Sequence, residues 1–239
     1  TETSPSCCVM AAFLWPPNDY AVVVASAFGK ILLITGNAEF LAERTRSRAV
    51  TAVTAEHPDC EVTEASASGL QAGELAGLTS ASLFSDNTLL VISDLQELGD
   101  GPQAELLAYC EGPSPEISLV LVHGGGAKGK GLLDKLRKLP AVSEVKLEAP
   151  KYERDYARWV HTEFRDLGAR IDDEGATLLV ASVGQDLRAL AGAADQLISS
   201  VDRGTEISAS VVRRYFGGRA DVRGYEIADA AIDGRINVA

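Results

Sequence analysis

Cysteine is scarce in this chain, and its few cysteines are poorly placed for chemistry. The 239 residues hold four of them: Cys7, Cys8, Cys60 and Cys110. Their spacing matches neither a zinc-ligand pattern nor a disulfide framework. The three histidines, His57, His123 and His161, are isolated from cysteines and from carboxylates at metal-ligand spacing. We therefore expect no metal site, no cofactor, and reduced thiols of the kind that cytosolic proteins carry.

Positive charge is also in short supply. The chain has 22 lysines and arginines against 34 aspartates and glutamates, which gives a formal net charge of -12. A protein that binds DNA on its own usually presents a basic face. The overall balance therefore argues against that role, and we expect DNA contact only within a larger assembly.

Long apolar runs are missing as well. The two longest near the start, Cys7 to Trp15 and Ala21 to Phe28, are both too short to span a bilayer. The first six residues, TETSPS, lack the basic region of a signal peptide. We expect a cytoplasmic protein with no membrane partner, and we assign residues 1–30 to an irregular arm without a function.

From residue 31 the pattern predicts an α/β domain over residues 31–150. Short apolar runs predict strands at 31–34, 61–67, 88–92, 117–122 and 144–147. Helices are expected between them: from an Asn37 N-cap to about residue 57, and over 72–78, 103–110 and 132–139. Strands that alternate with helices indicate a parallel sheet covered on both faces.

After Pro150 the strand pattern stops, and a helical domain is expected over residues 151–218. The first helix is predicted by apolar side chains at helical spacing: Tyr152, Tyr156, Val160, Phe164 and Leu167. A second runs from a cap at Asp172 or Asp173 to Val183, a third carries an apolar stripe over 187–201, and a short fourth begins at Ser208. Residues 219–239 would begin a further helical domain.

A glycine-rich loop follows the strand at 117–122 and resembles a phosphate-binding loop. Gly124, Gly129 and Lys130 have the G-x-x-x-x-G-K spacing, but Gly131 stands where a magnesium-binding hydroxyl is needed. The loop also follows the wrong strand, and the turn after the first strand, 35–39, has no lysine and no glycine run. We expect no ATP hydrolysis and at most a phosphate contact through Lys128 and Lys130.

Five strings in order resemble the delta subunit of bacterial DNA polymerase III, over about residues 31–235. They are LLITGNAEFLAER (32–44), SASLFSDNTLLVI (80–92), VGQDLRALAGAADQL (183–197), VVRRYFGG (211–218) and YEIADAAIDG (225–234). The resemblance implies an AAA+-like module without ATPase activity that belongs to the clamp loader, binds the sliding clamp and helps to open it on primed DNA.

The same resemblance assigns residues and partners. It implies that Leu83 and Phe84, beside Ser82, reach into an apolar pocket on the clamp. The chain itself is expected to hold no catalytic residue, although membership of the DNA-directed DNA polymerase holoenzyme would class it with the nucleotidyltransferases. Members of this family continue into a helical collar domain, of which residues 219–239 would be a truncated start. We therefore expect weakened contacts with the other clamp-loader subunits.

Two alternatives stay open at this point. The chain could be a divergent P-loop ATPase that uses Gly124 to Lys130, or a nucleic-acid-binding module that uses the basic helix at 128–138. The first predicts stabilisation by ATP, and the second predicts binding that weakens steeply with salt.

Overall fold

The computed structural model of the chain describes residues 28–80 and 85–220, with the side chains of 218–220 excepted. These residues form two compact units that divide between Ala149 and Pro150. Ser82, Leu83 and Phe84 lie outside the described residues, as do the expected N-terminal arm up to residue 27 and the expected collar segment from residue 221. Within the described ranges, no helix is both long enough and apolar enough to cross a bilayer.

The first unit contains a five-stranded parallel sheet in the order β2-β3-β4-β1-β5. Its strands are β1 (Ile31–Thr35), β2 (Glu61–Ser66), β3 (Thr88–Ser93), β4 (Ile117–His123) and β5 (Val142–Lys146). The three central strands are apolar almost throughout, as strands buried on both faces must be. The edge strand β2 is mostly polar, and none of its six residues is fully buried.

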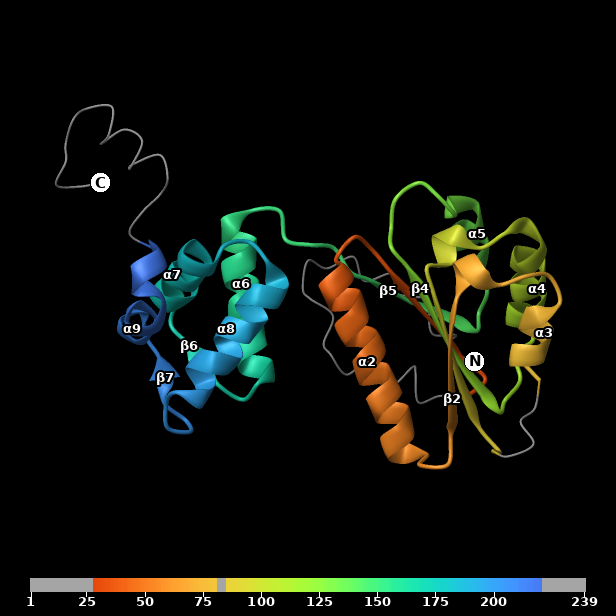
Figure 1. Cartoon of the computed structure of the whole chain (residues 1–239), viewed down its shortest axis with the longest axis horizontal. Helices are drawn as coiled ribbons and strands as arrows, with labels where there is room; N and C mark the ends of the chain where they lie inside the picture. Colours follow the sequence, from red (N-terminus) through yellow and green to blue (C-terminus); the bar gives the residue numbers. More distant parts are fainter. Residues whose placement is uncertain (1–27, 81–84, 221–239) are drawn as a thin grey trace, which may run out of the picture. The chain divides into compact units, whose positions relative to one another are not determined.

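Helices cover both faces of this sheet (Figure 1). The unit's helices are α2 (Glu39–Glu56), α3 (Glu74–Leu78), α4 (Asp100–Glu111) and α5 (Lys130–Leu136), with short 3-10 turns η1 (Ala67–Gly69) and η2 (Leu95–Glu97). Helix α2 lies on one face, and α3, α4 and α5 lie on the other. Leu106 of α4 and Leu136 of α5 pack there with Ile92 and Leu119 of the sheet in one core cluster.

The second unit is mainly helical. It contains α6 (Glu153–Asp166), α7 (Asp173–Val183), α8 (Leu187–Ser199) and α9 (Ala209–Ala220). The expectation that strands stop after Pro150 is wrong, because β6 (Arg170–Ile171) and β7 (Glu206–Ile207) pair in parallel. Two residues are too few to produce a periodic pattern, so these strands have no signature in the sequence.

The predicted caps of the second unit are largely present. The Asp172 carboxylate accepts a 2.6 Å hydrogen bond from the Gly175 N–H at the start of α7, so Asp172 rather than Asp173 is the cap. Asp186 caps α8 in the same way, through the Ala189 N–H at 2.7 Å. These contacts satisfy amide groups that have no partner within their own helix.

The predicted cap of α2 is wrong. The helix begins at Glu39 after Ala38, and the Asn37 side chain makes no cap hydrogen bond. Its Oδ1 atom instead accepts a 3.1 Å hydrogen bond from the Ala149 N–H, which is 112 residues away in the sequence. A partner so distant in the chain competes with the local cap, and sequence spacing gives no sign of it.

Candidate functional site

The turn after β1 is filled by the chain itself, through the backbone that follows β5. Gly36 has φ +136° and donates its N–H to the His123 carbonyl at 3.3 Å. The Leu147 N–H donates to the Thr35 carbonyl at 2.7 Å. A Cβ atom at position 36 would lie 1.7 Å from the Leu147 carbonyl oxygen. The backbone beyond β5 thus occupies the space directly against this turn.

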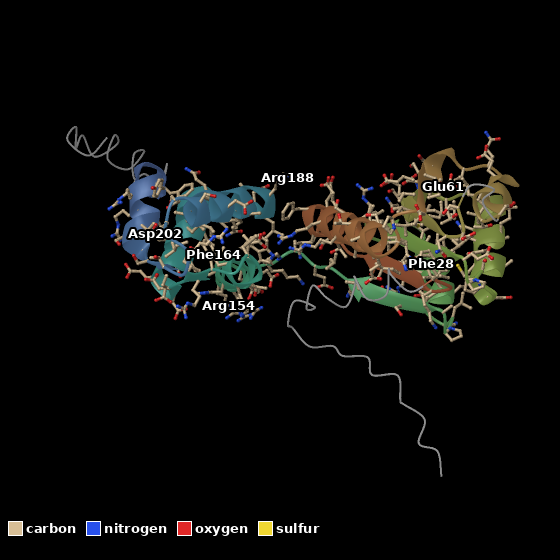
Figure 2. The ribbon with its side chains drawn as sticks, turned by 90° about the horizontal axis from the view of Figure 1, so that it is seen from below. Phe28, Glu61, Arg154, Phe164, Arg188 and Asp202 are labelled. Atoms are coloured by element: carbon tan, nitrogen blue, oxygen red, sulfur yellow. The ribbon has the colours of Figure 1, made fainter. Side chains whose placement is uncertain are left out.

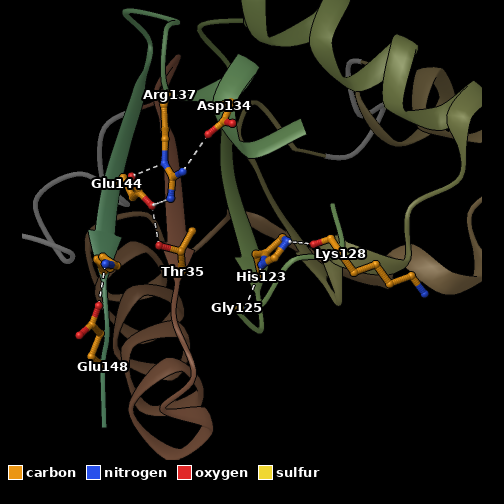
Figure 3. A network of polar contacts seen from close by, with 9 residues as sticks. Thr35, His123, Gly125, Lys128, Asp134, Arg137, Glu144 and Glu148 are labelled. Carbon is orange, nitrogen blue, oxygen red and sulfur yellow. Dashed lines mark hydrogen bonds and ion pairs between the residues drawn. The ribbon is translucent and has the colours of Figure 1, made fainter. Parts of the chain in front are cut away.

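An ion-pair network closes the same region between β1, β5 and the end of α5 (Figure 3). The Arg137 guanidinium donates to both Glu144 oxygens, at 2.8 and 2.7 Å, and the Thr35 hydroxyl donates to Glu144 Oε1 at 2.5 Å. Burial raises the pKa of the Glu144 carboxyl, but the hydrogen bonds from Arg137 and Thr35 outweigh burial and hold this pKa below its ordinary value. Arg137 is therefore held by ion pairs to Glu144 and Asp134, although its side chain stays 36% exposed.

The glycine loop after β4 is held by its own side chains. His123 is fully buried, and its Nδ1 accepts a 3.0 Å hydrogen bond from the Gly125 N–H. The neutral ring then carries its proton on Nε2, which donates to the Lys128 carbonyl at 3.0 Å. The Gly124 N–H donates to the Gln96 side chain at 3.0 Å. The Gly124 and Gly125 amides, which a phosphate-binding loop would use, therefore already donate hydrogen bonds to side chains of the chain itself.

The two predicted phosphate-binding lysines, Lys128 and Lys130, lie at the end of this loop, and Lys128 is already in an ion pair. The Lys128 ammonium forms an ion pair with the carboxylate of Glu97, the last residue of η2. Lys130 is exposed at the first position of α5, a helix of only seven residues. This geometry lends no support to a P-loop ATPase at 124–130, and the phosphate contact stays a prediction.

The buried His123 ring predicts a loss of stability in mild acid. Burial lowers the pKa of His123 below the ordinary 6.5, because the charged ring is poorly solvated. The unfolded chain therefore binds a proton at a higher pH than the folded chain does, and the free energy of unfolding rises with pH in this window. We expect the contribution of His123 to the free energy of unfolding to be constant above about pH 6.5. This contribution should fall as the pH drops from 6.5 towards the lowered pKa.

Urea unfolding followed by circular dichroism at a series of pH values measures this effect. His123→Gln supplies the control, because glutamine can accept and donate hydrogen bonds but does not titrate. The variant should be less stable near neutral pH and should lack the step below about pH 6.5. An unchanged pH profile in the variant would show that another group is responsible.

The predicted clamp-binding residues lie between two segments that the fold fixes. On the N-terminal side, the Gly73 N–H before α3 donates to Glu105 Oε1 of α4 at 2.7 Å, and Leu75 is buried in the core. On the C-terminal side, the Ser85 hydroxyl lies 2.5 Å from the Asp59 carbonyl oxygen, and it accepts from the Asn87 N–H at 3.2 Å. Residues 81–84 themselves lie outside the described ranges.

Two solved structures of Thermotoga maritima proteins show weak similarity to this chain, and no protein-family model or curated protein matches it by sequence. The RuvB Holliday junction branch migration motor gives a TM-score of 0.46 at 14% identity, over 87% of this chain and 70% of that one. Domain III of the replication initiation protein DnaA gives 0.47 at 18% identity, over 86% of this chain and 91% of that one.

A further comparison identifies the fold. The Bacillus subtilis DNA clamp loader delta protein (YqeN) is similar with a TM-score of 0.65 and 17% identity. The match covers 83% of this chain and 62% of that protein, so the chain spans less than two thirds of its length. The parallel five-stranded sheet and the delta-protein match together confirm the predicted α/β fold class, and the chain shares the fold of that delta protein.

Proposed function

We propose that this chain acts in DNA replication as a delta-type clamp-loader subunit that binds the sliding clamp and has no ATPase activity of its own. The observation that carries the proposal is the filled turn after β1, where the Leu147 backbone packs against Gly36. Together with the lack of a lysine in residues 35–39, this close packing supports a subunit that does not hydrolyse ATP itself. The similarity to a clamp loader delta protein supports the same assignment.

Leu83 and Phe84, beside Ser82, are the proposed clamp anchor. A leucine–phenylalanine pair offers a compact apolar surface, and a few such side chains carry most of the energy of a protein interface. The fixed segments on either side support this role, because ordered ends reduce the conformational entropy that docking would cost. The neighbouring Ser85 and Asp86 are polar, as the rim of an interface usually is.

Clamp opening would follow from differential affinity. A protein that binds the open clamp more tightly than the closed one shifts the population towards the open form without any covalent step. ATP binding and hydrolysis would belong to other subunits of the loader, and DNA would meet this chain within that assembly. Contact with the other clamp-loader subunits is part of the same proposal.

Titration of the sliding clamp from the same organism into this protein tests the proposal. We expect measurable binding by calorimetry, and we expect Leu83→Ala/Phe84→Ala to weaken it by about 2 kcal/mol or more, a factor of about 30. Asp86→Ala, at the exposed rim, should change the affinity by less than about threefold.

The circular dichroism spectrum and the thermal midpoint of the double variant must match those of the parent protein. Under that condition, loss of binding is due to the anchor and not to unfolding. A folded parent protein that does not bind the clamp, or a double variant that binds as tightly as the parent, would contradict the proposed role of these residues.

A further inference from the structure

The outer face of α6 carries a line of cationic side chains. Arg154, Arg158 and Arg165, here called the arginine line, recur at spacings of four and seven residues and therefore lie on one side of the helix. His161 falls between the last two on the same side. The line extends for about 16 Å along the helix axis, at about 1.5 Å per residue. The opposite side of α6 is buried and contains Trp159 and Phe164.

The guanidinium groups of this line are available to a ligand. The Arg154 and Arg158 side chains are 77% and 58% exposed, and they share a single carboxylate, Asp155, at 3.8 and 3.5 Å. Arg165 is exposed and has no ion pair within the ranges the structure describes. A second carboxylate, Asp173, lies 3.1 Å from His161 on the same side. Three guanidinium groups therefore face two carboxylates, and the line keeps a net positive charge.

An exposed aromatic ring stands at one end of the line. Tyr152, just before α6, is 61% exposed, the highest value of any large hydrophobic side chain described. The Arg154 guanidinium lies 5.2 Å from the centre of its ring, so the two groups already form a cation–π pair. In Figure 2 the labelled Arg154 lies at the surface of the helical unit, whereas Phe164 is surrounded by it.

The distribution of charge over the chain favours this unit for contact with an anion. Residues 150–220 hold ten lysines and arginines against eleven aspartates and glutamates, so most of the net charge of -12 lies outside this range. Nine of the ten cations are arginines. The planar guanidinium of arginine binds phosphate through paired hydrogen bonds and also stacks on aromatic rings, which the ammonium of lysine cannot do.

We propose that the outer face of α6, formed by Tyr152 and the arginine line, binds single-stranded nucleic acid. The arginines would contact successive backbone phosphates, while a base would stack on the exposed face of Tyr152. An acidic peptide would also meet the arginines, but it would gain little from an exposed, base-sized aromatic ring beside them. This binding does not depend on the proposed clamp anchor, which is in the other unit.

Fluorescence anisotropy with a labelled oligothymidylate at low salt, using the full chain, tests the inference. We expect Tyr152→Ala to weaken binding about tenfold and Tyr152→Phe to retain the affinity of the parent, because phenylalanine keeps the stacking face. The triple variant Arg154→Ala/Arg158→Ala/Arg165→Ala should flatten the slope of log K against log salt by about 2, since each lost phosphate contact on a single strand accounts for about 0.7.

A charge-matched control comes from the other basic segment. Lys135→Ala/Lys138→Ala/Lys146→Ala removes the same number of charges from exposed positions on α5, just after it and at the end of β5, and should leave the anisotropy titration nearly unchanged. Leu83→Ala/Phe84→Ala should likewise leave oligonucleotide binding intact, and the α6 variants should still bind the clamp. The two sets of variants therefore show whether the α6 inference or the clamp proposal has failed.

Three outcomes would overturn the inference. The parent protein could fail to bind the oligonucleotide at low salt, or the α5 variant could lose binding as strongly as the α6 triple variant. Alternatively, duplex DNA or a polyglutamate peptide could bind as tightly as the single strand and be insensitive to Tyr152→Ala, which would mean that the arginine line attracts polyanions without base stacking.

Discussion

Gly36→Ala is expected to destabilise the first unit by about 4 kcal/mol or more, enough to unfold it in many domains of this size. The added methyl group would lie 1.7 Å from the Leu147 carbonyl oxygen, and this contact is with backbone that cannot rotate away. The φ value of +136° adds strain for any residue with a side chain. Relief of the clash requires β5 to move from β1, which would break the hydrogen bond between Leu147 and Thr35.

Urea unfolding followed by circular dichroism measures this effect, and Gly131→Ala is the matched control. Gly131 lies inside α5, has no neighbour within 4 Å of an added Cβ, and has no positive φ. Alanine there should be neutral or stabilising by up to about 1 kcal/mol. A Gly36→Ala variant as stable as the parent protein would show that the chain beyond β5 does not pack against this turn.

Phe164→Ala is expected to cost the second unit about 3–5 kcal/mol. The Phe164 ring is fully buried on the inner face of α6, beside the buried residues Trp159 and Val160. Removal of the ring loses its transfer free energy and leaves a cavity that the surrounding helices can fill only in part. The lost contacts are apolar, so the effect should be independent of pH and salt.

Tryptophan fluorescence reports this change directly. The chain has two tryptophans, Trp15 and Trp159, so a Trp15→Phe background makes Trp159 the sole probe. The urea midpoint of the Trp159 signal should fall sharply in Phe164→Ala. Tyr152→Ala, a truncation of an exposed ring just before the same helix, should shift the free energy of unfolding by no more than about 0.5 kcal/mol. Equal shifts in the two variants would contradict the assignment of inner and outer faces to α6.

The regular part of the fold could be predicted from the sequence because its signals are local. The apolar runs at Ile31 and Ile117 begin buried parallel strands, and the helical spacing from Tyr156 to Phe164 defines the inner face of α6. The capping role of Asp172 could be predicted for the same reason, because a cap accepts a hydrogen bond from an amide only three residues away.

The features that close the candidate site could not be predicted in this way. Asn37 is expected from its position to cap α2, but its partner is Ala149, and Thr35 bonds Glu144 across 109 residues. Such contacts depend on which strands become neighbours, and the order β4-β1-β5 brings these residues together. One of these contacts does have a signal in the sequence. Arg137 and Glu144 have opposite charges and lie seven residues apart on either side of a turn, a pattern that favours an ion pair.

The filled turn at Gly36 also has a consequence for regulation. The Leu147 backbone that packs against this turn belongs to the same chain. Its effective concentration there is therefore the same at every cellular concentration of ATP. Under the proposed function, a change in the ratio of ATP to ADP would have no local binding equilibrium to act on at this turn. Any nucleotide dependence of an assembly that contains this protein would then originate in a neighbouring subunit. It would reach this chain as a conformational change at their shared interface.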